Sequence, residues 1–227
     1  KIMAELDFDS SSLTEINNKL QSSDDKKKWL IKNPGGTHAL AVGLDKRLYI
    51  KINGSVGYYC GGMNKLSEII INGSAGPGLA ENMMSGKVIV KGNASQYAGA
   101  SGHGGLIIIE GNASSRCGIS MKGIDILVKG NVGHMSAFMA QAGNLIICGD
   151  AGDALGDSIY EANIFVYGKI KSLGADCIEK KMTKKHTKIL ENILSTAKFS
   201  RFKIEKFKRF GSARKLYNFK VDNIKNY

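Results

Sequence analysis

The sequence predicts an all-β protein: a right-handed single-stranded parallel β-helix of about seven 19-residue coils, with helical N-terminal and C-terminal caps. Three observations predict it. A glycine returns every 19 residues, apolar residues alternate around that glycine, and no helical periodicity runs between residues 48 and 168. We therefore expect an N-terminal cap and leading strand at residues 1–47, the β-helix at 48–175, and a basic helical tail at 176–227.

The repeated glycine occupies seven positions at intervals of 19 residues, without an insertion. A period of this length marks stacked coils that each contribute one short strand, at about 4.8 Å per coil. A left-handed hexapeptide β-helix needs a coil of about 18 residues, which does not fit this interval. The positions are Gly54, Gly73, Gly92, Gly111, Gly130, Gly149 and Gly168.

Apolar residues stand at even distances from each repeated glycine, as Ile50, Ile52 and Val56 do around Gly54. Side chains of a strand alternate between its two faces, so these residues form one buried face. Small residues follow at fixed distances, such as Gly57 and Gly61, and mark the corners of the coil.

A second apolar row lies three residues before the repeated glycine, where an isolated coil would face water. It begins at Lys51 and is large and apolar in the next six coils. Two interpretations stay open, because the terminal segments of this chain or a partner protein could cover the row. The candidate interface residues are Ile70, Ile89, Ile108, Leu127, Ile146, Phe165, Arg214 and Tyr217.

The N-terminal segment has the features of a cap, which the open end of a solenoid needs. Serines at 10–12 precede Leu13, Ile16 and Leu20, a pattern that predicts a short amphipathic helix. The Asn-Pro-Gly-Gly sequence at 33–36 then predicts a turn into a leading strand that ends near Val42.

The C-terminal tail carries the entire charge excess of the chain. Residues 169–227 contain 17 Lys and Arg against 5 Asp and Glu, whereas residues 1–168 contain 15 of each. A helix is predicted from Thr183 to Ala197, with Ile189, Ile193 and Leu194 on one face. Basic residues then alternate with Phe202, Phe207 and Phe210, which we interpret as anchors for the tail and not as a nucleic-acid site.

No catalytic residue, metal site or cofactor site is expected on this chain. The four cysteines are far apart in the sequence, and the four histidines have no metal-ligand partner at helical spacing. Buried free thiols, no signal peptide and no membrane span favour a cytoplasmic protein. The Asp-rich segment 149–157 is interpreted as a polar corner, with a contact role for Asp157 and Glu161.

Several longer strings resemble the GXGXG domain that closes the large subunit of glutamate synthase. The first is the Gly-x-x-Gly-x-x-x-Gly pattern of Gly149–Gly156, which is also similar to the corresponding β-helical chain of formylmethanofuran dehydrogenase. Other strings are similar to stand-alone versions of this domain, as in the second subunit of N-methylglutamate synthase. These strings are His38–Leu44, Val56–Cys60, Ala80–Gly86, Arg116–Gly123, Gly133–Gly143, Gly156–Ala162 and Phe210–Phe219.

The resemblance implies a subunit that joins two partners. One partner would resemble a glutamine amidotransferase. The other would resemble the synthase domain that carries FMN and an iron–sulfur cluster. In N-methylglutamate synthase the overall reaction converts methylamine and glutamate to N-methylglutamate and ammonia. A formylmethanofuran-dehydrogenase-like complex and an independent ligand-binding β-helix protein stay open as alternatives.

Overall fold

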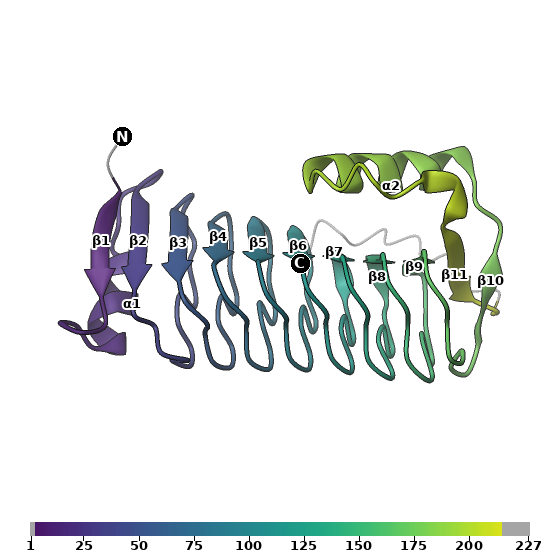
Figure 1. Ribbon diagram of the computed structural model, residues 1–227, viewed down its shortest axis with the longest axis horizontal. Coiled ribbons are helices and arrows are strands. Elements are labelled where there is room, and N and C mark those ends of the chain that lie inside the picture. The colour runs from purple at the N-terminus through teal and green to yellow at the C-terminus, as the bar shows by residue number, and fades with distance from the viewer. Residues whose placement is uncertain (1–2, 215–227) are drawn as a thin grey trace, which may run out of the picture.

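The computed structural model describes residues 3–214, which form an elongated column of stacked coils (Figure 1). The strands join into an 11-stranded sheet with the order β1-β2-β3-β4-β5-β6-β7-β8-β9-β11-β10. The strands are β1 (Ala4–Asp7), β2 (Lys28–Lys32), β3 (Tyr49–Asn53), β4 (Glu68–Ile71), β5 (Lys87–Val90), β6 (Leu106–Ile109), β7 (Lys122–Val128), β8 (Ala142–Ile147), β9 (Asn163–Val166), β10 (Cys177–Lys180) and β11 (Lys208–Ser212). The helices are α1 (Leu13–Gln21), α2 (Lys184–Thr196) and the short 3-10 helix η1 (Ile204–Lys206).

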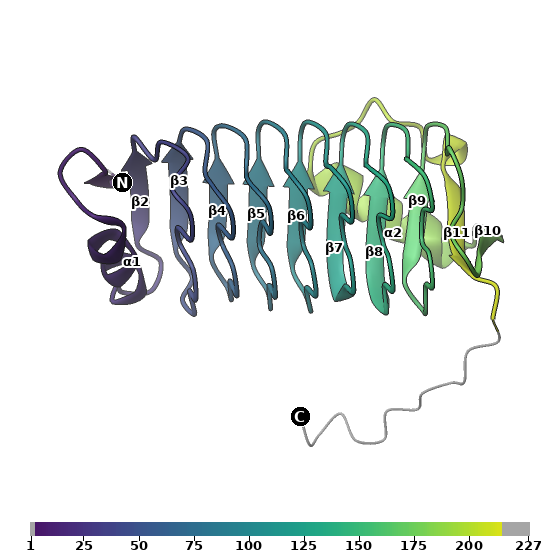
Figure 2. The ribbon, with the colours of Figure 1, turned by 90° about the horizontal axis from the view of Figure 1, so that it is seen from below.

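Strands β3 to β9 pair in parallel with an offset of 19 residues, apart from a bulge after Lys122 in β7. The predicted parallel β-helix is therefore confirmed. The column also starts earlier than the glycine period indicates, because β1 and β2 pair in parallel ahead of β3. Figure 2 shows β2 beside β3 at this end of the column. Trp29 of β2 faces Ile50 of β3, an offset of 21 residues that the 19-residue period does not reveal.

The repeated glycine reflects a close approach between neighbouring coils. A Cβ on Gly111 would lie 2.3 Å from Oδ1 of Asn93 and 2.6 Å from the carbonyl oxygen of Gly92. The Gly111 N–H donates a hydrogen bond to that same carbonyl at 2.9 Å. Similar contacts under 3.0 Å recur at Gly92, Gly130, Gly149 and Gly168. The period is therefore set by the space between coils.

A ladder of side chains runs beside these glycines and joins each coil to the next. Oδ1 of Asn93 accepts a hydrogen bond from the Asn112 N–H at 2.8 Å, and the pattern continues from Asn112 to Asn131. It ends where Asp150 accepts from the Lys169 N–H at 2.7 Å. These bonds satisfy backbone donors at a corner where no strand continues.

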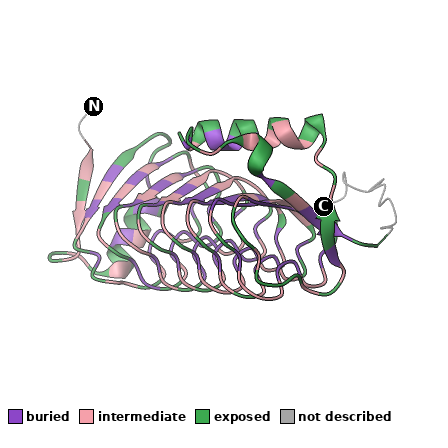
Figure 3. Ribbon diagram, turned by 45° about the vertical axis from the view of Figure 1, so that its right-hand side comes forward, coloured by how far each residue is buried: buried purple, intermediate pink, exposed green. Residues whose placement is uncertain are grey.

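The core is filled by the strand residues two and four positions before each glycine, shown as buried segments in Figure 3. Ile69, Val88 and Ile107 have no exposed surface. At the N-terminal end, α1 adds Ile16 and Leu20 to the same core. Its first turn is closed by a capping box between Ser12 and Glu15, so the predicted N-terminal helix is confirmed.

The prediction of a leading strand ending near Val42 is wrong. The strand of this segment is β2, which ends at Lys32 before the Asn-Pro-Gly-Gly turn. Residues 37–43 form turns, because Ala39 and Ala41 adopt left-handed backbone angles with φ of 53° and 56°. A strand cannot continue through such residues, and later coils use the same conformation at their corners.

The C-terminal cap contains strands as well as the predicted helix. Helix α2 spans Lys184–Thr196, close to the predicted range. The description of the tail as helical is incomplete, because β11 pairs antiparallel with both β9 and β10 and so extends the sheet. Phe207 and Phe210 are buried, as expected of anchors. Within residues 3–214, neither α-helix has the length and apolar run needed to cross a bilayer.

Candidate interaction surface

The second apolar row divides into a sealed half and an open half. Ile108, Leu127, Ile146 and Phe165 keep at most 3% of their surface exposed. Helix α2 lies over β6 to β9 and covers them (Figure 1), packing Leu190, Ile193 and Leu194 onto the row together with Phe199 and Phe207. For this half, coverage by a terminal segment of the same chain is the correct interpretation.

The seal forms because α2 is amphipathic. Leu190, Ile193 and Leu194 are buried on one face, whereas Lys188, Glu191 and Asn192 are exposed. Burying an aliphatic side chain of this size stabilises a fold by about 1.5–3 kcal/mol, so three of them fix the helix on the sheet. Ile189 borders the contact and is partly buried.

The open half lies on β2 to β5, and we call its residues Leu30, Lys51, Ile70 and Ile89 the open stretch. Their strands pair directly, with Leu30 facing Lys51, Lys51 facing Ile70, and Ile70 facing Ile89. All four side chains are half-buried, and Ile89 borders the cluster under α2. Sequence reasoning missed Leu30, because the offset from β2 to β3 is 21 residues and not 19.

Charged residues flank the open stretch on both sides. Lys87 pairs with Glu68 at 3.2 Å, and Lys91 pairs with Glu110 at 2.6 Å. Lys28 lies over the Tyr49 ring at 5.8 Å. The stretch is apolar except for Lys51, which lies between Leu30 and Ile70. A largely apolar centre with a charged rim is the composition typical of a protein–protein contact.

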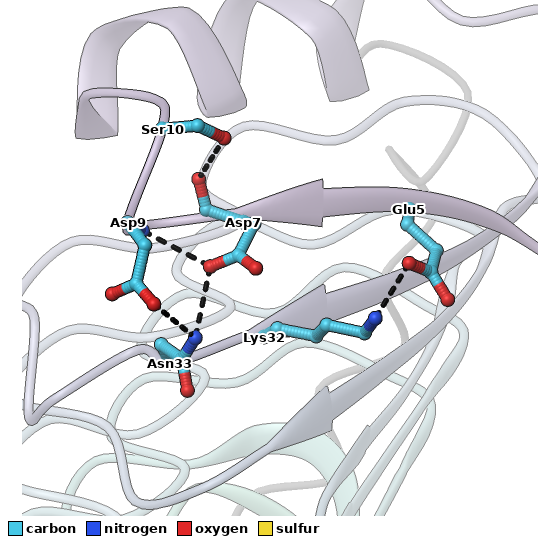
Figure 4. A network of polar contacts seen from close by, with 6 residues as sticks. All are labelled: Glu5, Asp7, Asp9, Ser10, Lys32 and Asn33. Carbon is cyan, nitrogen blue, oxygen red and sulfur yellow. Dashed lines mark hydrogen bonds and ion pairs between the residues drawn. The ribbon is translucent and has the colours of Figure 1, made fainter.

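A polar network closes the N-terminal end of this face (Figure 4). Asn33 Nδ2 donates to Oδ1 of Asp7 at 3.0 Å and to Oδ2 of Asp9 at 2.9 Å. Lys32 pairs with Glu5 at 2.6 Å and so links β2 to β1. Hydrogen bonds from the Asp9 N–H and from Asn33 lower the pKa of Asp7, while its limited desolvation acts the other way. The network fixes the first strand of the column.

A second polar chain fixes the C-terminal cap to the column. Asn144 donates to Asp125 at 2.7 Å, Asn163 donates to Asn144 at 3.1 Å, and Arg209 of β11 donates to Asn163 at 3.0 Å. Burial raises the pKa of Asp125, although the hydrogen bonds from Asn144 act in the opposite direction. These residues therefore form a chain of hydrogen bonds across successive coils, from the carboxyl group of Asp125 to the guanidinium group of Arg209.

The tail residues of the predicted interface have different outcomes. Arg214 is exposed and forms an ion pair with Asp176, and its N–H donates to Ser212 Oγ at 3.1 Å. That ion pair holds Arg214 against the turn that precedes β10. Tyr217 lies outside the described residues.

The cysteines lie in surroundings that suppress their reactivity. Cys60, Cys117, Cys148 and Cys177 are free and buried. Desolvation raises the pKa of Cys60 and of Cys117 to about 12, which suppresses the thiolate. Among residues 3–214, no group of three His, Cys, Asp or Glu side chains could hold a metal ion.

Two histidines are hydrogen-bonded spacers. His38 stacks on Tyr58 at 3.9 Å and accepts a hydrogen bond from the Tyr58 N–H at 3.0 Å. His186 accepts from the Thr183 N–H at 3.2 Å, at the start of α2. Desolvation, with Arg209 and Lys185 nearby, lowers the pKa of His186.

The Asp-rich corner binds the next coil. Asp153 pairs with Lys171 at 2.7 Å, and this hydrogen bond is the main reason that the pKa of Asp153 is lowered. Asp157 accepts from the Ala175 N–H at 3.1 Å and from Ser158 Oγ at 2.8 Å. Glu161 is exposed. The corner is polar, as predicted, and the contact role of Asp157 and Glu161 stays a prediction.

The methionines divide between core and surface. Met83 and Met121 are fully buried. Met63, Met84 and Met139 are 38% to 48% exposed. Core filling therefore accounts for only part of the methionine content.

The comparison with curated proteins gives one clear relative. The chain is 57% identical over 228 residues to "Protein GlxC" of Rhizobium meliloti (strain 1021), an alignment that covers 99% of this chain and 100% of that protein. No protein-family model matches the chain.

Proposed function

The chain belongs to the GlxC family, and on that premise we propose that it is a non-catalytic scaffold subunit of a glutamate-synthase-like complex. In this proposal the β-helix joins a glutamine-amidotransferase-like subunit to a synthase-like subunit that carries FMN and an iron–sulfur cluster. The chain itself binds neither cofactor. The complex acts in the cytoplasm.

One observation carries the scaffold role, namely the open stretch. Ile70 and Ile89 continue a row that the chain seals with its own helix over the next four coils. This apolar row is covered by α2 at one end and partly exposed at the other, so its open end is a contact area of the same chemistry that the described residues leave uncovered. We assign that area to a partner subunit.

The sequence resemblance supports the identity of the complex. Strings such as Arg116–Gly123 and Gly133–Gly143 are similar to the second subunit of N-methylglutamate synthase. The proposed overall reaction therefore converts methylamine and glutamate to N-methylglutamate and ammonia. The chemistry takes place on the partner subunits, and this chain holds them at a fixed separation.

Copurification with the two partner subunits tests the proposal. The full chain is coexpressed with both, and the purified assembly is analysed for its protein chains, flavin and iron. The variant Ile70→Asp should lose the partner while keeping the column intact, because this side chain is already partly exposed and its cross-strand neighbour on β3 is Lys51. The matched control is Leu173→Asp, which places the same charge at a 38% exposed residue away from the row.

Three outcomes decide against parts of the proposal. A chain that purifies alone under these conditions contradicts the scaffold role. Molybdenum or tungsten in place of flavin would favour the formylmethanofuran-dehydrogenase-like complex. Equal loss of partner in the control and in the Ile70→Asp variant would mean that the open stretch is not the contact.

A further inference from the structure

The cap formed by residues 176–214 is strongly cationic, whereas the column is neutral. It contains 12 Lys and Arg against 4 Asp and Glu, a net charge of +8. Eight of the cations are exposed and have no ion pair within the described part of the chain. We call these residues the cationic surface: Lys181, Lys184, Lys185, Lys188, Lys198, Arg201, Lys203 and Lys206.

The lysines of α2 stand at the end of the helix where they destabilise it. Lys184 and Lys185 occupy the first turn, which contains no acidic residue, and Lys188 follows in the second. The partial positive charge at a helix N-terminus favours acidic residues there, each by about 0.3–1 kcal/mol. Basic residues at this end therefore oppose helix stability, and such local conflicts concentrate at functional positions.

The aromatic residues of the cap do not form a stacking platform for nucleic-acid bases. Phe199, Phe207 and Phe210 are 3% to 7% exposed, and Phe202 packs against Tyr167. Binding of single-stranded nucleic acid depends on exposed aromatic faces between the cations. A membrane surface is also disfavoured, because Ile178 is the one large apolar side chain that residues 176–214 expose.

We propose that the cationic surface binds an acidic surface on a protein partner, and this inference rests on the scaffold function proposed above. Because the column is neutral and the excess positive charge lies at one end, the molecule has a net electric dipole along its long axis. Complementary charge steers such a molecule so that the cap meets the partner first. The inner face of α2 then seals the apolar row, and its outer face contributes to partner recognition.

Charge reversal on α2 tests this inference without threatening the fold. The triple variant Lys184→Glu/Lys185→Glu/Lys188→Glu puts acids near the helix N-terminus, where they stabilise the helix. The control Lys19→Glu/Lys65→Glu/Lys122→Glu makes the same charge change at three exposed lysines outside the cap. Binding of each full-length chain to the purified partner subunits is measured by titration between roughly 0.05 and 0.5 M salt.

The expected result is an increase in Kd of about 30- to 100-fold for the α2 variant at the lowest salt, with a weaker salt dependence. The control should change Kd less than about threefold. Equal effects of both variants, or none from the α2 variant, would overturn the inference. Tighter binding of wild-type chain to a single-stranded RNA of about 20 nucleotides than to the partners would also overturn it. If wild-type chain binds neither partner at any salt, the scaffold function fails first.

Discussion

Because neighbouring coils approach closely at Gly111, we predict that Gly111→Ala destabilises the column. The destabilisation comes from the new Cβ contact and not from the backbone conformation at this position. Gly111 has no left-handed φ, so alanine adopts its backbone conformation freely. The new Cβ would meet Asn93 Oδ1 at 2.3 Å and the Gly92 carbonyl oxygen at 2.6 Å. The Asn93 side chain could rotate away, but the Gly92 carbonyl belongs to the backbone and already accepts the Gly111 N–H.

The free-energy cost of Gly111→Ala can be worked out from the atoms that the new Cβ displaces. Relieving the contact with Gly92 requires the two coils to separate locally, which weakens the 2.9 Å hydrogen bond between them. Moving Asn93 also removes the bond that its Oδ1 accepts from the Asn112 N–H. Overpacking of this kind costs about 1–3 kcal/mol, and a lost hydrogen bond adds about 1 kcal/mol. We expect a total of about 2–4 kcal/mol.

Thermal unfolding followed by circular dichroism measures this cost. For a chain of this size about 1 kcal/mol shifts Tm by about 2–4 °C, so Gly111→Ala should lower Tm by about 5–15 °C. The matched control is Gly211→Ala in β11, where the new Cβ would meet its nearest atom at 3.5 Å. Equal Tm shifts in the two variants would refute the argument that coil spacing fixes the glycine period.

Three further predictions concern the packing and titration of the cap and core. Leu190→Ala should release α2 at a cost of about 2–5 kcal/mol and speed proteolysis of residues 182–207, whereas the exposed neighbour Glu191→Ala should not. Asp125→Asn should raise Tm at pH 7. Burial raises the pKa of Asp125, which means that the ionised carboxylate destabilises the folded state relative to the unfolded state. That gain should vanish as pH falls below the ordinary carboxyl pKa of about 4, and a pH-independent gain would contradict it. Iodoacetamide at about pH 8 should leave all four buried cysteines unmodified until denaturant is added, and rapid labelling of Cys60 in the native chain would contradict its raised pKa.

The sequence predicted the column well, because its packing repeats. A Cβ at any repeated glycine meets the previous coil, so the period appears directly in the residues. The segments outside the period were predicted less well. The 21-residue offset between β2 and β3 breaks the pattern. Ala39 adopts a left-handed backbone conformation, and because alanine rarely does so, its identity does not predict that the strand has ended.

The sequence predicted which residues form the candidate surface, but not which of them α2 covers. Six apolar outward positions are visible in the sequence, yet nothing local distinguishes Ile70 from Ile108. Their difference depends on where α2 lies, which is a tertiary contact between residues more than 80 positions apart. Leu30 could have been found by aligning Trp29 and Ile31 with the buried strand positions of β3.

The length of α2 explains why the row is open at one end. Thirteen residues make a helix of about 20 Å. Four coils spaced at about 4.8 Å have nearly the same length, so α2 covers β6 to β9 and stops before β5 (Figure 1). About six or seven more residues would seal Ile89 and Ile70 as well. The chain instead leaves the helix after Thr196 and reverses at Lys198, which adopts a left-handed φ of 59°. A helix that existed only to seal this row would be longer and would not begin with lysines. Its length and its charge are both accounted for if a second protein covers the remaining strands and meets the outer face of α2.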